Sequence, residues 1–262
     1  MARETPMPSG TPLLKLTGVV KRFGGVTAVN DVSIEVPEGI VMGLVGPNGA
    51  GKTTLLNLVS GFDSSFGGSV NFRGSEVARW SAHRLARAGV VRTFQHAHVF
   101  GSMTVISALT AAAHVNERAH AGLGLHGLLP SRRARAASLR TAMDVIRQLR
   151  LDPWVETECS QLPYGIKKRL GIGMALMRHP ALLLLDEPAA GLNSQETHEL
   201  VQQIQELRQS GLTIVLVEHN MPLIMAVSEK IVVLDHGLKV AEGDPKSVAN
   251  DPAVIGAYLG RR

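Results

Sequence analysis

The segment at residues 46–53 constrains the fold of this chain more than any other feature. It reads Gly-Pro-Asn-Gly-Ala-Gly-Lys-Thr and matches the pattern G-x-x-x-x-G-K-[ST], which is typical of a loop that holds phosphate groups. The apolar run at residues 40–45 predicts a buried strand before the loop, and residues 52–59 predict a helix after it. Because such a loop requires a strand before it and a helix after it, we predict an α/β fold with a phosphate site.

The residue types in this loop explain how it would hold phosphate. Its glycines allow the backbone to curl so that successive N–H groups point at the anion, and the helix N-terminus adds roughly half a positive charge. Lys52 is expected to contact the β- and γ-phosphates, and the Thr53 hydroxyl to coordinate Mg²⁺. The expected nucleotide-binding residues of the loop are Gly46, Pro47, Asn48, Gly49, Ala50, Gly51, Lys52, Thr53 and Thr54.

A second apolar run, at residues 182–185, ends in two acidic residues. Strands of this kind are buried on both faces of a sheet, and in open α/β sheets ligands bind at the carboxyl ends of the strands. We therefore expect Asp186 to hold Mg²⁺ through its water shell and Glu187 to face an attacking water molecule. Adjacent acids at a strand end are otherwise common as turn or cap residues, and that alternative stays open at this point.

Strands and helices alternate along much of the chain, which predicts a mainly parallel sheet with helices on its faces. Between residues 96 and 160 the composition shifts to Ala, Leu and Arg with helical spacing, which predicts a helical insertion.

Asn193 with Glu196 predicts a capping box that opens a later helix. The residues expected on the inward face of that helix are Leu200, Val201, Ile204 and Leu207. Further strands are expected at residues 13–19, 32–36, 69–72, 89–94, 212–217 and 231–234, and a short helix at 81–88.

The composition excludes several classes of protein. With 45% hydrophobic and 19% charged residues among 262, the chain can bury a core, which excludes a disordered protein. The single cysteine, Cys159, excludes a disulfide scaffold, and no uncharged apolar run reaches the roughly 18 residues of a membrane-spanning helix. Residues 1–12 contain no apolar stretch, so we expect no secretory signal. Aromatic residues make up 4%, which argues against a stacking platform for single-stranded nucleic acid.

The chain is basic, with a formal net charge of +5 and an isoelectric point near 9.7, which favours an anionic partner. Its densest basic cluster is opposed only by Asp144. Three interpretations stay open for this cluster: a solvated helix face, which we favour, a surface that faces an anionic membrane, and a contact with nucleic acid. We do not expect a nucleic-acid partner. The cluster comprises Arg132, Arg133, Arg135, Arg140, Arg147 and Arg150.

The phosphate loop and the paired acids together resemble those of the nucleotide-binding subunits of ABC transporters. The resemblance covers about residues 13–260. It implies a P-loop NTPase fold of the ABC type, with a mainly parallel sheet, an N-terminal antiparallel β region and an inserted helical subdomain. The expected boundaries are residues 12–260 for the nucleotide-binding domain and residues 96–160 for the helical subdomain within it.

Three further residues match positions that this family uses. Gln95 ends the run Val-Val-Arg-Thr-Phe-Gln and matches the Q-loop glutamine, which implies contact with Mg²⁺ and sensing of the γ-phosphate. His219 follows a buried strand and matches the switch histidine, which contacts the γ-phosphate and orients the attacking water. Phe23 lies where the family stacks an aromatic ring on adenine, with simple packing as the alternative. The resemblance thus implies the catalytic residues Glu187, His219, Gln95 and Lys52, and the metal-binding residues Thr53, Gln95 and Asp186.

The family signature Leu-Ser-Gly-Gly-Gln reads Leu-Pro-Tyr-Gly-Ile at residues 162–166. Pro163 has neither a hydroxyl group nor a backbone N–H, so the usual serine contact to the γ-phosphate on the partner subunit is absent. Tyr164 and Gly165 lie at the start of a helix whose N-terminus can still offer donors to an anion. We therefore expect both residues to contact the nucleotide that a second subunit binds.

Several segments narrow the resemblance to the LivG-type ATPases of high-affinity branched-chain amino-acid uptake systems. They are Lys-Arg-Phe-Gly-Gly, Val-Val-Arg-Thr-Phe-Gln-His, Leu-Pro-Tyr-Gly, Asp-Glu-Pro-Ala-Ala-Gly-Leu-Asn and the terminal Ala-Tyr-Leu-Gly. This implies a peripheral subunit on the cytoplasmic face of the plasma membrane that hydrolyses ATP with Mg²⁺ to power an importer. The implied partners are transmembrane permease subunits, a second ATPase subunit and, indirectly, an external amino-acid-binding protein. The alternatives are the ATPase of another ABC transport system, for urea or amide uptake or lipopolysaccharide export, and an ATP-switched ABC protein that does not transport.

Overall fold

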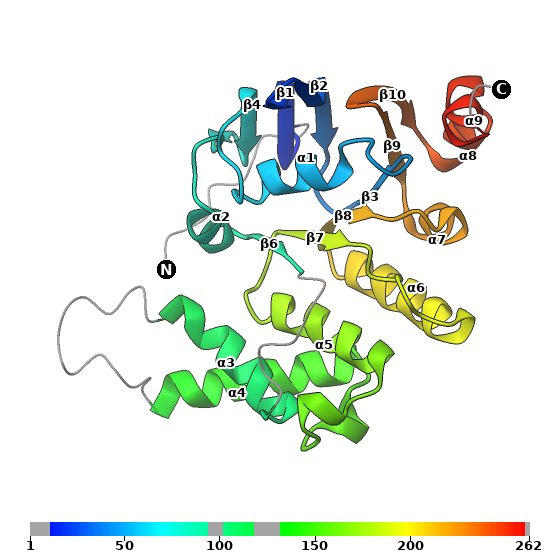
Figure 1. Cartoon of the computed structure of the whole chain (residues 1–262). Coiled ribbons are helices and arrows are strands. Elements are labelled where there is room, and N and C mark those ends of the chain that lie inside the picture. The colour runs from blue at the N-terminus through cyan, green and yellow to red at the C-terminus, as the bar shows by residue number, and fades with distance from the viewer. Residues whose placement is uncertain (1–10, 94–101, 118–131, 260–262) are drawn as a thin grey trace.

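The computed structural model describes residues 11–93, 102–117 and 132–259, and within them the chain forms two β-sheets (Figure 1). Sheet A has four strands in the order β2-β1-β4-β5, and all of its neighbouring strands are antiparallel. This sheet accounts for the antiparallel region expected near the N-terminus. Its strands are β1 Leu14–Phe23, β2 Val26–Val36, β4 Gly67–Phe72 and β5 Ser75–Glu76.

Sheet B has six strands in the order β10-β9-β3-β8-β7-β6. Every pair from β9 to β6 is parallel, and β10 joins the edge antiparallel to β9. The prediction of a mainly parallel sheet is therefore confirmed. The strands are β3 Val41–Val45, β6 Val90–Arg92, β7 Leu182–Asp186, β8 Thr213–Val217, β9 Lys230–Asp235 and β10 Leu238–Gly243.

The helices divide between the two sheets and a separate helical region. Figure 1 shows α1 between sheet A and sheet B, whereas α3, α4 and α5 gather at the opposite end of the molecule from β1 and β2. The helices are α1 Lys52–Val59, α2 Ala82–Ala88, α3 Val105–Glu117, α4 Arg132–Gln148, α5 Tyr164–Leu176, α6 Ser194–Gln209, α7 Met221–Val227, α8 Pro245–Ala249 and α9 Pro252–Leu259. Two short 3₁₀ turns, Asp152–Trp154 and Cys159–Gln161, precede α5.

The inner strands of sheet B are buried on both faces, because successive residues of a strand point into two different hydrophobic cores. Leu182 and Leu184 of β7 pack into the core that sheet A and α1 share. Leu183 and Leu185 point to the opposite face and pack into the core that contains α3 to α6. This double burial is why β7 reads as an unbroken leucine run in the sequence rather than as an alternating pattern.

The helical region is held together by close packing of α3, α4 and α5. A Cβ atom on Gly173 of α5 would lie 3.1 Å from both Leu109 of α3 and Leu149, just beyond α4. The helix α5 therefore approaches its neighbours so closely that even a methyl group at this position would require their side chains to shift by a few tenths of an ångström. It begins at Tyr164, beyond the insertion expected at residues 96–160, and yet it packs with that insertion.

The helix α6 confirms its predicted capping box and its predicted inward face. Its capping box is present: the Asn193 side chain accepts from the Glu196 backbone, and the Glu196 side chain accepts from the Asn193 backbone. Val201 is half-buried and packs against the core, and Gln203 is a further buried residue on the inward face. The Gln203 amide donates to the carbonyl oxygen of Leu149 at 3.2 Å, so a polar side chain occupies the inward face by bonding to a neighbouring element.

Within the described residues, none of the helices combines the length and the apolar character that a membrane crossing demands.

Candidate functional site

The phosphate loop joins β3 to α1 with a backbone that only glycine tolerates at its first position. Gly46 has a φ of +151°, and a Cβ atom there would approach the Leu234 carbonyl oxygen closer than the 3.0 Å limit of real Cβ contacts. Gly49, further along the loop, has a φ of +81° but faces open space. The loop therefore curls tightly against β9 at one end and is exposed at its tip.

Lys52 is buried at the start of α1, and its ammonium group points back into the loop. Its Nζ donates to the carbonyl oxygens of Gly46 at 2.8 Å and Pro47 at 2.9 Å. Burial lowers the pKa of Lys52, and the negative charges of Glu187 and Asp186 raise it in part. The lysine therefore lies within electrostatic reach of both acids at the end of β7, as the sequence predicts.

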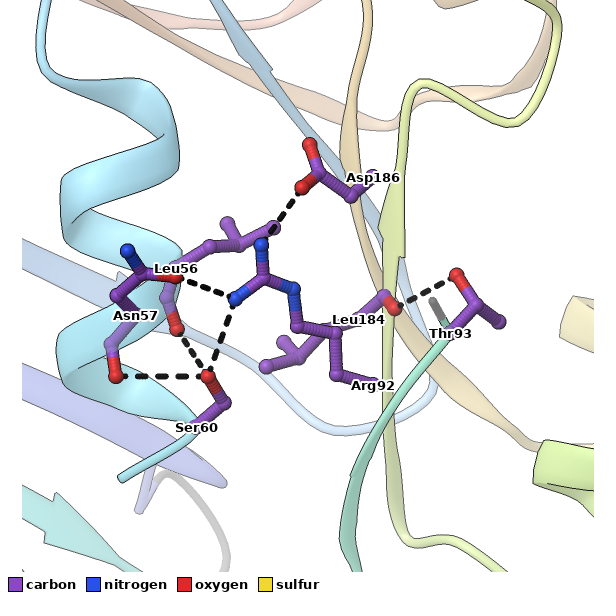
Figure 2. Close-up of polar contacts among 7 residues, drawn as sticks. All are labelled: Leu56, Asn57, Ser60, Arg92, Thr93, Leu184 and Asp186. Carbon is purple, nitrogen blue, oxygen red and sulfur yellow. Dashed lines mark hydrogen bonds and ion pairs between the residues drawn. The ribbon is translucent and has the colours of Figure 1, made fainter. Parts of the chain in front are cut away.

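Asp186 is buried at the end of β7 and uses only one of its two carboxylate oxygens in the described contacts. Oδ2 accepts from Nη2 of Arg92 at 2.7 Å (Figure 2). Oδ1 is buried and has no hydrogen-bond partner among the residues that the structure describes. A carboxylate oxygen is a ligand that Mg²⁺ prefers, and Thr53 lies exposed beside Lys52, so the residues present fit a magnesium site.

Glu187 adopts a strained backbone conformation next to His219. Its φ is +47°, which is uncommon for a residue with a side chain and recurs at functional sites. Its Oε1 lies 3.6 Å from Nδ1 of His219, and both side chains are partly exposed. Lys168 of α5 donates to the Glu187 carbonyl oxygen at 3.3 Å, so the helical region contacts this residue directly.

Glu218 is a buried acid beside the site that the sequence analysis does not anticipate. It is 1% exposed, and its carboxylate accepts from the backbone N–H of Ala189 at 2.7 Å and of His219 at 3.2 Å. Burial raises the pKa of Glu218 despite these bonds. The carboxylate thus connects the end of β8 to the turn that follows Glu187. In the sequence, an acidic residue that stands between a buried strand and the predicted switch histidine is the pattern that could have indicated this role.

Comparison with known proteins places this geometry in a family. A family model described as "ABC transporter" matches residues 29–190, which is more than half of the chain. The chain belongs to the ABC transporter ATP-binding family. A second family model, described as "Branched-chain amino acid ATP-binding cassette transporter", matches residues 239–262.

The ABC cassette relatives are similar over nearly the full chain. The chain is 42% identical to the high-affinity branched-chain amino acid transport ATP-binding protein LivG of Salmonella typhimurium, over 95% of this chain and 98% of that protein. It is 39% identical to BraF of Pseudomonas aeruginosa, named in the same way, with the same coverage. A solved ATP-binding cassette of an ABC transporter in its ADP conformation superposes with a TM-score of 0.83, at 29% identity and 95% and 99% coverage.

These similarities establish the family of the chain and its general class of activity. It is an ATPase subunit of the ABC transporter type, and cassettes of this type bind nucleotide. The ABC fold expected from the sequence is confirmed.

The remaining predicted site residues lie apart from the phosphate loop or outside the described residues. Tyr164 is half-exposed at the start of α5, and a Cβ atom on Gly191 would lie 2.9 Å from its ring. Gly165 is buried against the side chain of Glu196. Among the described contacts, none joins either residue to the phosphate loop of the same chain. Gln95 lies outside the described residues.

Phe23 ends β1 with its side chain 53% exposed, which disfavours the alternative that it only packs. The ammonium group of Lys21 lies 4.7 Å from the centre of its ring. Lys21 is itself held by an ion pair with Asp63 at 2.6 Å and a hydrogen bond to the Ser65 carbonyl oxygen at 2.7 Å. An anchored cation therefore supports an aromatic ring that is accessible to a ligand.

Proposed function

We propose that this chain is the ATP-hydrolysing subunit of an ABC importer for branched-chain amino acids, and that it acts with Mg²⁺. The observation that carries the proposal is that the buried Lys52 ammonium lies within electrostatic reach of the carboxylates of Asp186 and Glu187, which follow the end of β7 in sheet B. The names of the relatives and the family model at residues 239–262 support the choice of transported substrate.

Lys52 and the loop around it would bind the phosphates. In the structure its Nζ bonds to two loop carbonyls, and the β- and γ-phosphates would take their place as partners of stronger charge. Thr53 and the unpartnered Oδ1 of Asp186 would hold Mg²⁺, with Gln95 as a further proposed contact. Mg²⁺, when bound, supplies positive charge that offsets the charge developing on the phosphates. The exposed ring of Phe23 would stack on adenine.

Glu187 and His219 would direct the hydrolytic water. The carboxylate of Glu187 is partly exposed beside the metal-binding Asp186, where it can accept a proton from a water molecule or hold that molecule in line. His219 lies close enough to orient the same carboxylate or to contact the γ-phosphate. The backbone of Glu187 is held in its strained conformation by a hydrogen bond to β8, in which the Glu187 N–H donates to the Val217 carbonyl oxygen at 2.9 Å. This bond fixes the position of the residue.

Tyr164 and Gly165 would complete the nucleotide site of a second ATPase subunit. The helix α5 begins after Pro163 without a side-chain cap, so its first N–H groups remain available to an anion on that subunit. ATP drives closure only through contacts that the closed pair makes and the open pair lacks. The helical region would transmit closure to the permease subunits. This chain would then act at the cytoplasmic face of the membrane, with an external binding protein on the other side.

The proposal is tested by purifying the chain with its membrane subunits, placing the complex in proteoliposomes and measuring ATP turnover. We expect a binding protein loaded with leucine, isoleucine or valine to raise turnover above that with the empty protein. The Glu187→Gln complex serves as the matched control and should show no stimulation. Stimulation by a urea- or amide-loaded binding protein instead, or none by any loaded protein, would contradict the assigned substrate.

A further inference from the structure

Arg92 joins two parts of the candidate site that lie far apart in the sequence. It ends β6, its side chain is 12% exposed, and its guanidinium group has partners on both sides (Figure 2). Nη1 donates to Oδ1 of Asn57 at 2.6 Å and to Oγ of Ser60 at 3.4 Å. Nη2 donates to Oδ2 of Asp186 at 2.7 Å. One side chain therefore connects the end of α1 to the end of β7.

The backbone at Arg92 is fixed to β7 by the pairing of strands. The backbone N–H of Thr93 donates to the Leu184 carbonyl oxygen at 3.0 Å, and β6 pairs in parallel with β7 through Arg92 opposite Leu184. A guanidinium group is planar and permanently charged, with donors in a rigid fork. Because both the backbone and the fork of Arg92 are held, the oxygen that it binds on Asp186 has little freedom to rotate.

Because Arg92 holds Oδ2 of Asp186, the direction in which Oδ1 points is also fixed. Figure 2 shows Oδ1 on the side of the carboxylate away from Arg92, and this oxygen is buried without a partner among the described residues. A buried oxygen without a partner lowers stability unless a ligand uses it. Proteins commonly orient a carboxylate that binds a metal in this way. A neighbouring group holds one oxygen by a hydrogen bond, and the other oxygen faces the metal site.

We propose that Arg92 is a positioning residue that orients Asp186 so that Oδ1 faces Mg²⁺, an inference that rests on the proposed function. Through Asn57 it also ties Asp186 to α1, the helix that begins with Lys52 and Thr53. The metal ligands on two different elements are thereby kept in register. Ser60 does not depend on Arg92 for its own place, because its hydroxyl donates to the Leu56 carbonyl oxygen at 2.6 Å.

The test measures how much Mg²⁺ strengthens nucleotide binding. Isothermal titration gives the affinity of the full chain for a non-hydrolysable ATP analogue, once with Mg²⁺ and once with a chelator, and the ratio of the two isolates the metal site. We expect Arg92→Met to lower this ratio by about 10- to 100-fold while the affinity in chelator stays unchanged. Arg92→Lys has one donor centre and cannot hold both partners, so it should restore the ratio only in part.

Two further variants separate positioning from a general structural effect. Asp186→Asn should lower the same ratio, and adding Arg92→Met to it should cause no further loss, because the arginine acts through the aspartate. Asn57→Leu keeps the ion pair but removes the shorter of the two bonds that join Arg92 to the end of α1, and it should cause a smaller loss of the same sign. This variant and Arg92→Lys carry the test if Arg92→Met does not fold.

Three results would overturn the inference. Arg92→Met could keep the wild-type ratio, could lose affinity equally with and without Mg²⁺, or could add its full effect to Asp186→Asn. A wild-type chain that binds the analogue equally well with and without Mg²⁺ would overturn the magnesium role in the proposed function, and the inference with it. The wild-type measurement therefore tells the two failures apart.

Discussion

Replacing Gly46 by alanine tests whether the phosphate loop has the backbone described above, and Gly49 provides a matched control. Both glycines lie in the same loop at positive φ, +151° and +81°. An alanine at positive φ costs about 1–2 kcal/mol. At Gly49 nothing lies within 4 Å of the new methyl group, so this strain is the whole cost.

The methyl group on Gly46 meets a second obstacle. It would overlap the carbonyl oxygen of Leu234, a fully buried residue of β9 that also pairs through the sheet. Because backbone in a central strand cannot move aside, we expect Gly46→Ala to lower the free energy of unfolding by about 4 kcal/mol or more, against about 1–2 kcal/mol for Gly49→Ala. In a chain of this size each kcal/mol lowers the melting temperature by about 2–4 °C.

Urea unfolding of both variants without nucleotide measures this difference. The midpoints should fall in the order wild type, Gly49→Ala, Gly46→Ala, with equal dependence of the free energy on urea. Equal midpoints for the two variants, or a larger loss at Gly49, would refute the reasoning, because a methyl group overlaps the backbone of Leu234 at Gly46 and meets nothing at Gly49.

Three further predictions concern the site and its support. Lys52→Met should weaken nucleotide binding by about 10- to 100-fold, because it removes charge-assisted bonds to phosphate, and an unchanged affinity by titration calorimetry would contradict this role. Burial raises the pKa of Glu218, so the folded state holds its proton more tightly than the unfolded chain, and its contribution to stability is lost as pH rises through the folded-state pKa. Glu218→Gln should therefore flatten part of the fall in stability that is measured as pH rises above the ordinary pKa of a glutamate, and a pH profile identical to that of the wild type would contradict this prediction. Asn193→Ala should lower stability by about 1 kcal/mol through loss of the capping box, and an unshifted urea midpoint would show that the cap contributes nothing.

Elements with a strong local pattern could be predicted from the sequence. The helix α1 has the predicted bounds, and β7 follows its leucine run, because burial on both faces favours apolar residues along the strand. The edge strand β10 was not predicted, because its residues are exposed or half-buried and show no apolar run. It is placed by pairing with β9 and by Lys239, whose Nζ donates to the Ser33 carbonyl oxygen at 2.7 Å.

The local motifs of the site could be predicted from the sequence, but the tertiary contacts that support them could not. Lys52, Asp186 and Glu187 stand in short patterns whose chemistry is recognisable, and the fold brings them within electrostatic reach. Arg92 meets Asn57, 35 residues before it, and Asp186, 94 residues after it, so no spacing in the sequence connects them. Such partners become visible only when the strand order of sheet B is known.

The central claim is that Glu187 directs the water that cleaves ATP bound at the phosphate loop. Single-turnover hydrolysis of Mg²⁺-ATP by Glu187→Gln, measured beside its ATP affinity, tests this claim most directly. The account predicts wild-type affinity with cleavage slowed by about 10²- to 10⁴-fold, since the amide cannot accept a proton. Cleavage at the wild-type rate with normal affinity would contradict it.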